Sequence, residues 1–147
     1  MQLALDLAEL GCGWVNPNPM VGAVIVKENR IIGTGYHHRY GDNHAERDAF
    51  ANCSESAQGA TIYVTLTPCC HQGKTPACTD AIIEQGISRV VIGSADPNSL
   101  VGDKSLAILR QAGIIVETGV LTAECDALNP VFFHYIQTKK PYVVMKY

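Results

Sequence analysis

A regular alternation of strand-like and helix-like segments in the second half of the chain is the feature that most constrains its fold. Apolar, β-rich runs at 60–66, 89–93 and 114–119 alternate with helical patterns at 79–86 and 103–112. Strands that are each followed by a helix are typical of an α/β sheet with parallel strands and covering helices. We therefore expect the second half to form the parallel part of such a sheet.

The first half of the chain predicts a helix, a hairpin and a second helix. Apolar residues at helical spacing indicate a helix over 3–10, and VGAVIV (21–26) with RIIGTGY (30–36) indicates two strands joined by a short turn. A further helix is expected over 44–53, and a last one over roughly 122–137. The order α-β-β-α-β-α-β-α-β-α predicts a three-layer α/β/α fold with a mixed five-stranded sheet.

Size and charge limit the classes of function. The chain has 147 residues, enough for one domain, and its net charge of −3 gives no global basic footprint for nucleic acid. No stretch approaches the ~20 apolar residues of a membrane span, and no positive segment precedes Asp6 and Glu9 as in a signal peptide. We expect a cytoplasmic protein without nucleic-acid or membrane partners, and its low charged fraction of 17% favours a homo-oligomer.

Four residues carry the chemistry. His44 and Glu46 stand at the start of an expected helix, and Cys69 and Cys78 flank a loop rich in Gly, Pro and Thr. Cytosolic thiols stay reduced, and one His with two Cys supplies N and S donors that suit zinc. Structural zinc sites normally use four protein ligands, whereas catalytic sites use three and bind a water. We therefore expect one catalytic Zn²⁺ per chain with a bound water, and Glu46 as its proton carrier.

The order H-x-E, then P-C and a second Cys, is a known signature of zinc nucleobase deaminases. The usual form has two residues between the cysteines, whereas eight (70–77) intervene here. Each element alone is common: His-x-Glu can simply begin a helix, and two cysteines can be buried thiols. Cys70 is an alternative candidate for the ligand position assigned to Cys69. A non-enzymatic, structural zinc module is the alternative, and it requires a fourth protein ligand such as Cys70 or His71.

Several stretches resemble the deaminase domain of bacterial bifunctional riboflavin-biosynthesis deaminase/reductase proteins. They are NPNPMVGAVIVKENRIIGTGYHHRYGDNHAE, GATIYVTLTPCCHQGKTPAC, DPNSLVG and AGIIVETGVL, and together they cover almost the whole chain. The resemblance implies a cytidine-deaminase-like fold and hydrolytic deamination of a diaminopyrimidinone ribosylamine 5′-phosphate. His44, Cys69 and Cys78 match the zinc ligands of the family, and Glu46 matches its proton shuttle.

The resemblance also implies a set of substrate-binding residues. Asn18 matches the family Asn of NPNP, in position to hydrogen-bond the pyrimidine. His37, His71, Lys74 and Asn98 match polar positions expected around the substrate ring and its ribose phosphate. Lys74 would supply a positive charge to bind the phosphate. The sequence alone fits a solvent-exposed lysine in a loop equally well.

The sequence departs from the family pattern at two positions. Thr67 stands where the family usually has Glu, and Cys70 where it usually has Ser. Neither is a ligand or the shuttle, so we expect the chemistry to survive, with a local hydrogen bond or ion pair left unmade at Thr67. The main alternative function is another zinc deaminase, acting on a nucleobase, a nucleotide or tRNA adenosine. The acidic net charge and few loop aromatics argue against RNA.

The tail at 138–147 begins a new strand pattern after the last helix. Composition leaves two interpretations open, a short edge strand or the start of a second domain. The resemblance favours the second, because the family's reductase domain begins with a strand like KPYVVMK. We therefore expect a zinc-dependent deaminase domain at 1–137 and the first strand of a truncated reductase domain at 138–147. NADP is expected only if a reductase domain follows.

Overall fold

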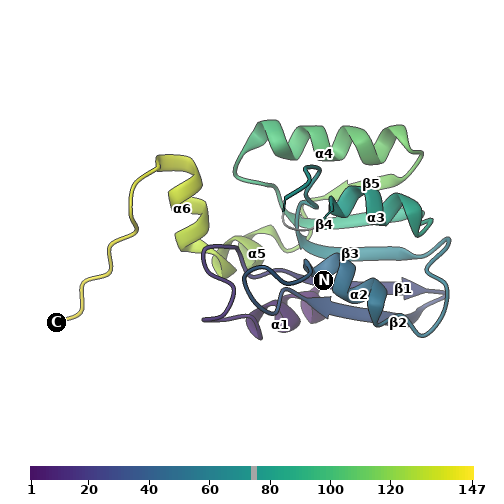
Figure 1. Ribbon diagram of the computed structural model, residues 1–147, viewed down its shortest axis with the longest axis horizontal. Coiled ribbons are helices and arrows are strands. Elements are labelled where there is room, and N and C mark those ends of the chain that lie inside the picture. The colour runs from purple at the N-terminus through teal and green to yellow at the C-terminus, as the bar shows by residue number, and fades with distance from the viewer. Residues whose placement is uncertain (74–75) are drawn as a thin grey trace.

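A mixed five-stranded sheet lies at the centre of the computed structural model, which describes residues 1–73 and 76–147 (Figure 1). The strands are β1 (Gly22–Lys27), β2 (Arg30–Tyr36), β3 (Thr61–Leu66), β4 (Arg89–Ser94) and β5 (Ile115–Thr118), in the order β2-β1-β3-β4-β5. β1 pairs antiparallel with β2 and with β3, whereas β3, β4 and β5 run parallel. The predicted mixed sheet, parallel in its second half, is confirmed.

Helices cover both faces of this sheet. They are α1 (Gln2–Glu9), α2 (Ala45–Ala51), α3 (Cys78–Glu84), α4 (Ser99–Gln111), α5 (Thr122–Leu128) and α6 (Pro130–Thr138). α1 packs on β1, β2 and β3, and α5 packs on β4 and touches α1. On the other face α2 packs on β1 and β2, α4 packs on β5, and α3 lies between α2 and α4. The expected three-layer arrangement is therefore present.

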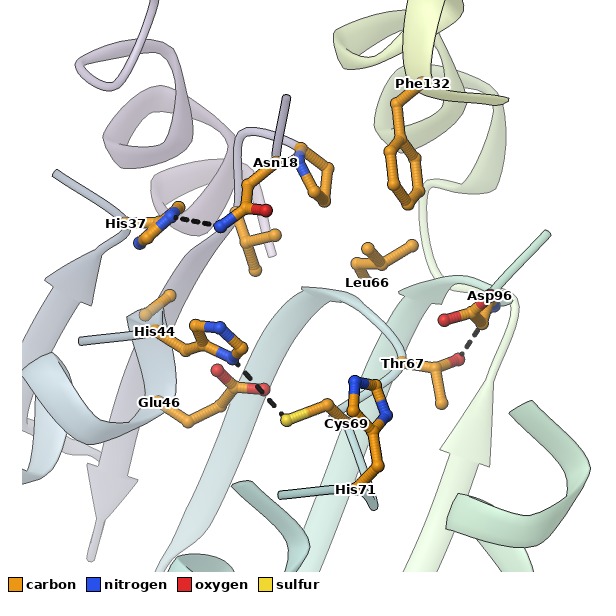
Figure 2. Close-up of a pocket in the computed structure, with 13 residues that line it drawn as sticks. Asn18, His37, His44, Glu46, Leu66, Thr67, Cys69, His71, Asp96 and Phe132 are labelled. Atoms are coloured by element: carbon orange, nitrogen blue, oxygen red, sulfur yellow. Dashed lines mark hydrogen bonds between the residues drawn. The ribbon is translucent and has the colours of Figure 1, made fainter. Parts of the chain in front are cut away.

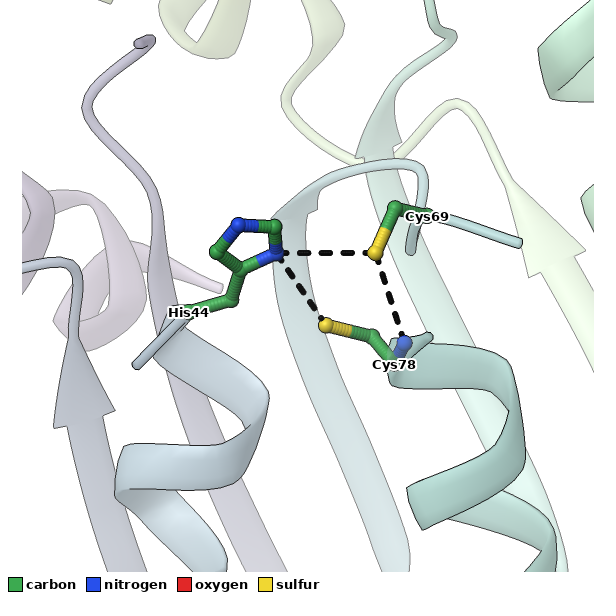
Figure 3. Close-up of side chains that lie close together, drawn as sticks. All are labelled: His44, Cys69 and Cys78. Carbon is green, nitrogen blue, oxygen red and sulfur yellow. Dashed lines mark hydrogen bonds between the residues drawn. The ribbon is translucent and has the colours of Figure 1, made fainter. Parts of the chain in front are cut away.

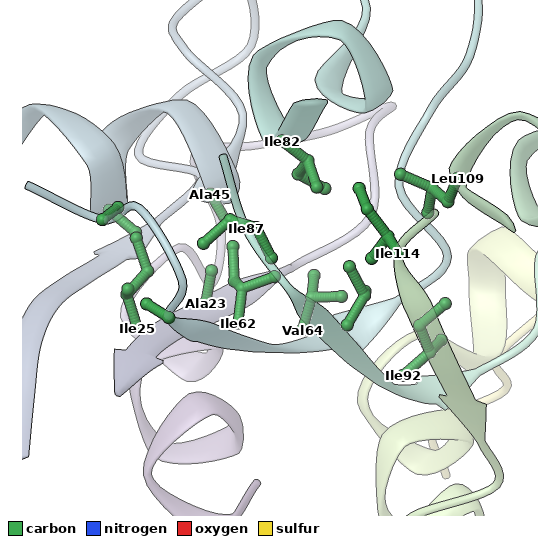
Figure 4. Close-up of a cluster of buried hydrophobic side chains, with 14 of the residues drawn as sticks. Ala23, Ile25, Ala45, Ile62, Val64, Ile82, Ile87, Ile92, Leu109 and Ile114 are labelled. Atoms are coloured by element: carbon green, nitrogen blue, oxygen red, sulfur yellow. The ribbon is translucent and has the colours of Figure 1, made fainter. Parts of the chain in front are cut away.

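A cluster of buried apolar side chains fills the space between the sheet and α2, α3 and α4 (Figure 4). Alternate strand residues point into it, as the period of two along a strand requires. Its fully buried members include Ala23, Ile25, Ala45, Ala49, Ile62, Val64, Ile82, Val90, Ile92 and Leu109. Burial of this layer fixes α2 and α3 over the sheet, and both helices begin at the edge where β3 ends.

Two glycines of β2 let α2 lie directly on the sheet. A Cβ atom at Gly33 would stand 2.6 Å from the carbonyl oxygen of Ala49, and one at Gly35 would overlap the backbone of α2. Any larger side chain at these positions would lift the helix away from the strand. The height of α2 above the sheet, and with it the position of its first turn, therefore depends on these glycines.

The structure corrects two of the predicted helices. The expected single helix over 122–137 is two helices, α5 and α6, which meet at Asn129. Pro130 takes the first position of α6, because proline lacks an N–H and disfavours a helical residue before it. α4 begins at Ser99 rather than 103, since Asn98 serves as its N-cap residue and the Ser-Leu-Val-Gly segment that follows is helical.

The tail adopts no regular structure and does not extend the sheet. Residues 141–147 form neither helix nor strand and are exposed, and Figure 1 shows α6 and this tail projecting away from the sheet. The edge-strand interpretation therefore has no support here, while the reductase interpretation stays a prediction. Across the ranges 1–73 and 76–147, no helix is long and apolar enough to cross a membrane.

The junction of α5 and α6 is fastened to the loop before β1. The Asn129 side chain accepts a hydrogen bond from the Met20 N–H (2.7 Å) and donates one to the Met20 carbonyl oxygen (2.8 Å). Asn129 is buried, with 8% of its surface exposed. One amide side chain thus satisfies both backbone groups of a residue 109 positions earlier in the chain.

Replacing Asn129 with Ala should therefore lower the free energy of unfolding by about 1–3 kcal/mol, because it leaves two backbone groups without their partner. Chemical denaturation with a far-UV readout measures the change. Gln137→Ala, at an exposed position of α6, is the matched control and should stay within ~0.5 kcal/mol of the parent. Equal stability of Asn129→Ala and the parent would show that the two hydrogen bonds contribute nothing.

Candidate metal centre and active site

Three side chains converge where β3 ends and where α2 and α3 begin (Figure 3). His44 is the N-cap residue of α2, Cys69 follows β3, and Cys78 is the first residue of α3. His44 Nδ1 lies 3.5 Å from Cys69 Sγ and 3.4 Å from Cys78 Sγ. The potential ligand atoms all lie within 4.8 Å of one another. The structure thus brings together three residues that the sequence separates by up to 34 positions.

This spacing fits tetrahedral zinc. Zn–N distances of 2.0–2.1 Å and Zn–S distances of 2.3 Å place N and S ligand atoms roughly 3.6 Å apart. The observed separations of 3.4 and 3.5 Å agree with that value. In the part of the chain that the structure describes, the potential ligand group has three members. Three protein ligands are typical of a catalytic rather than a structural zinc site.

Cys70 does not join the cluster. Its Sγ atom lies 3.8 Å from the Val101 carbonyl oxygen of α4 and donates toward it. His71 lines the neighbouring cleft and is likewise outside the ligand group. Among the described residues, neither candidate for a fourth ligand takes that position, so the structural-zinc alternative loses its main requirement.

Protons are unevenly distributed over the three ligands. The pKa of Cys69 is lowered to about 4, because the Cys78 thiol donates a hydrogen bond to its sulfur, and His44 and the Cys78 N–H add to this. The pKa of Cys78 is raised for the converse reason. A hydrogen bond with Cys69 also raises the pKa of His44. The two thiols therefore favour different protonation states, and a proton is held more readily on Cys78 than on Cys69.

Glu46 lies beside the ligands, in the first turn of α2 (Figure 2). Only 3% of it is exposed, and burial raises the pKa of its carboxyl group. Its Oε2 atom is buried and finds no hydrogen-bond partner within residues 1–73 and 76–147. A buried polar atom without a partner costs about 1–3 kcal/mol, so a native protein normally has a reason to keep one. A water or substrate group on the zinc side would satisfy it.

A cleft of about 200 Å³ opens over these residues. Three of the predicted substrate-binding residues line it: Asn18, His37 and His71. Its other walls are Pro19, Val21, His44, Ala45, Glu46, Leu66, Thr67, Cys69, Asp96 and Phe132. A second hollow of about 230 Å³, bounded by Tyr40, Asp42 and Gly73, shares Asn18, His44 and His71 with the cleft. Together they form a site that extends from the buried Glu46 to the exposed His71.

The Asn18 amide is held in one orientation. His37 Nδ1 donates to the Asn43 carbonyl oxygen (2.9 Å), so its Nε2 atom accepts a hydrogen bond from Asn18 Nδ2 (3.0 Å). Burial lowers the pKa of His37, which keeps the ring neutral and able to accept. Asn18 Oδ1 therefore faces away from His37, as Figure 2 shows, and is free to accept a hydrogen bond in the cleft.

Asn98 is not among the residues that line the cleft. It is exposed, and its backbone N–H donates to Asp96 Oδ1 (2.7 Å). Lys74 lies outside the described residues. Both assignments stay predictions.

Sequence reasoning missed Asp96 and Phe132. Asp96 follows β4, and its backbone N–H donates to Thr67 Oγ1 (3.2 Å). Its position in the sequence, directly after a parallel strand, was the available signal, because ligands of α/β sheets bind outside the carboxyl ends of the strands. Phe132 comes from α6 and points toward the cleft opposite His44 (Figure 2). Its segment reads as an ordinary helix, so no local pattern marks it.

Thr67 departs from the family pattern, yet its hydroxyl group has hydrogen-bond partners in the structure. Its side chain is buried, and its hydroxyl donates to the Ser94 carbonyl oxygen (3.3 Å) while accepting from the Asp96 N–H. The hydroxyl thus joins the ends of β3 and β4, and its own hydrogen-bonding capacity is met.

The geometry is matched by known proteins. Residues 1–94 match the family described as the cytidine and deoxycytidylate deaminase zinc-binding region. The chain belongs to this family. It is 59% identical over 147 residues to riboflavin biosynthesis protein RibD of Actinobacillus pleuropneumoniae, covering all of this chain and 39% of that protein. It is 46% identical to the diaminohydroxyphosphoribosylamino-pyrimidine deaminase of Buchnera aphidicola subsp. Schizaphis graminum, covering 96% of each.

Solved structures agree. The RibD protein of Acinetobacter baumannii superposes with a TM-score of 0.92 at 44% identity, over 96% of this chain and 40% of that one. The predicted resemblance to riboflavin-biosynthesis deaminases and the cytidine-deaminase-like fold are both confirmed. The zinc-binding family and the His-Cys-Cys cluster together support zinc as the metal of this deaminase domain.

Zinc binding should release roughly one to two protons per ion at pH 7. Both cysteines bind zinc as thiolates, so the proton that is favoured on Cys78 must leave, and the raised pKa of His44 adds a fraction. Zinc affinity should consequently fall as the pH is lowered. Titration of metal-free protein with zinc in weakly buffered solution, read with a pH indicator, measures the release.

Cys70→Ser is the matched control for this measurement. Its sulfur lies against Val101 and outside the ligand group, so the variant should release the same number of protons as the parent. Zinc binding without proton release would contradict the assignment of a protonated Cys78.

Proposed function

We propose that this chain catalyses the zinc-dependent hydrolytic deamination of a diaminopyrimidinone ribosylamine 5′-phosphate in riboflavin biosynthesis. One observation carries the proposal: three zinc-type ligands lie beside a buried carboxylate oxygen without a partner, in the lining of one small cleft. Relatives named as this deaminase and as RibD support the choice of substrate.

His44, Cys69 and Cys78 would hold the metal, which when bound acts as a Lewis acid and makes water nucleophilic at neutral pH. The Glu46 carboxylate then carries the protons. It accepts one proton from the attacking water and delivers it to the ring nitrogen, and it then passes the remaining hydroxyl proton of the tetrahedral intermediate to the departing amine. The C–N bond breaks, a C=O bond forms, and ammonia leaves. Because burial raises the pKa of Glu46, its carboxyl group holds a proton more readily near neutral pH than an exposed glutamate.

The cleft orients the substrate ring. Asn18 presents Oδ1 to the cleft, because His37 fixes its amide, and this oxygen suits an N–H of a pyrimidine. Leu66 and Phe132 offer apolar contacts to the ring. The adjoining hollow near His71 has room for the ribose phosphate. Lys74 is proposed as its charged partner and Asn98 as a further polar one, both on the family resemblance.

The setting of the enzyme completes the proposal. We infer one zinc ion with a catalytic water per chain, a cytoplasmic location, a homo-oligomeric state and no nucleic-acid or membrane partner. Residues 138–147 are proposed as the first strand of a reductase domain, supported by the KPYVVMK pattern and by relatives of which this chain spans 39%. NADP would belong to that domain.

Ammonia release from the phosphorylated diaminopyrimidine is the decisive assay. We expect turnover that a zinc chelator abolishes and added zinc restores. Deoxycytidylate and a tRNA anticodon stem-loop serve as parallel substrates, and we expect far lower rates with both. Faster turnover of either one would assign the chain to a different branch of zinc deaminases.

Glu46→Gln should lower kcat by roughly 10²–10⁴-fold while zinc content stays at the parent level, because the amide keeps the shape of the side chain but cannot accept and release a proton. Turnover and metal analysis on the same preparation give both values. Glu84→Gln, at an exposed position of α3, is the control and should match the parent. Full activity in Glu46→Gln would exclude Glu46 as the proton carrier.

A further inference from the structure

Arg47 occupies a position where its charge is locally unfavourable. It lies in the first turn of α2, between Glu46 and Asp48. The N-terminus of a helix carries a partial positive charge, so acidic residues stabilise it and a cation does not. Arg47 is nevertheless half-buried there rather than extended into solvent. A residue that departs from a local preference in this way usually has a compensating interaction.

The compensating interaction is a pair of hydrogen bonds to the segment that leads into α3. Arg47 Nε donates to the Pro76 carbonyl oxygen (3.1 Å), and Nη2 donates to the Ala77 carbonyl oxygen (3.0 Å). Ala77 is the N-cap residue of α3, and its carbonyl oxygen accepts only a long hydrogen bond (3.5 Å) from the Ala81 N–H of that helix, so Arg47 is its closer donor. The planar, rigid guanidinium group thus donates to two consecutive carbonyl oxygens immediately before Cys78.

This contact spans the two halves of the metal centre. Cys69 and Cys78 are tied to each other, because the Cys78 N–H donates to Cys69 Sγ (3.3 Å) and the Thr79 N–H donates to the Cys69 carbonyl oxygen (3.1 Å). His44 belongs to α2, a different element. Arg47, three residues after His44, joins that helix to the residues on which the position of Cys78 depends.

We propose that Arg47 is a positioning residue of the zinc site, which holds Cys78 at ligand distance from His44. It touches neither ligand in this role and acts through the backbone of Pro76 and Ala77. The inference rests on the zinc binding proposed above. Without these two hydrogen bonds, metal binding must also fix the positions of Pro76 and Ala77. Loss of partners outside the ligand shell typically weakens metal affinity by 10–100-fold.

Zinc competition against a chelator of known affinity tests the role directly and needs no substrate. Arg47→Met, which keeps length and helix propensity, should raise the zinc dissociation constant by roughly 10–100-fold. Arg47→Lys keeps the charge, but one ammonium cannot grip both carbonyls, so we expect an intermediate rise of at least about threefold. The rate of zinc release to a chromogenic chelator should increase in the same order.

Arg30→Met is the matched control. Arg30 is an exposed arginine of β2 that bonds Glu55 (2.9 Å), remote from the metal ligands, and its loss should leave zinc affinity unchanged. Circular dichroism of the metal-free variants establishes that they are folded. Parent-like zinc affinity in Arg47→Met would overturn the proposal; if that variant does not fold, parent-like affinity in Arg47→Lys would do so. Absence of zinc binding in the parent would instead refute the proposed function itself.

Discussion

The site depends on how β3 ends. This strand lies between β1, which runs antiparallel to it, and β4, which runs parallel, and its side chains are largely buried. Because β3 and β4 are parallel, their carboxyl ends meet at one edge, where Thr67 joins them through Ser94 and Asp96. The chain then turns away with Cys69 and returns as α3 with Cys78. Close packing of α2 on Gly33 and Gly35 positions the start of that helix, and with it His44, the third candidate ligand.

Burial gives this arrangement its chemistry and also its cost. Glu46 is almost fully buried with one oxygen unpaired, and beside it the half-buried Cys69 has a lowered pKa while the buried Cys78 has a raised one. A hydrophobic core would be more stable without such groups. A divalent cation held by two thiolates offsets their charge and gives the carboxylate a polar neighbour. The metal-free centre is therefore the less favourable state, and metal binding and folding stability are coupled.

Much of this could be predicted from the sequence, for identifiable reasons. Strands such as β1 and β2 have strong period-two patterns, and the ligands with Glu46 stand in motifs short enough to be seen. The break at Asn129 was missed because helical periodicity continues through it, and only Pro130 marks it. Phe132 and Arg47 were missed because their roles depend on tertiary contacts. Arg47 in particular reads as a surface charge, since its partners are backbone carbonyls that leave no trace in sequence.

The cleft has two walls of different origin. All three ligands, Glu46, Asn18 and His37 lie within residues 1–94, the span that matches the zinc-binding deaminase family. Asp96 and Phe132 lie beyond that span, and Asn129 holds the Phe132 helix against the loop of Asn18 through Met20. The metal and proton chemistry proposed above would therefore come from the segment shared across the family. Phe132 lies outside that segment and is not a member of the ligand group, so a change of its side chain would alter the cleft without removing a candidate ligand.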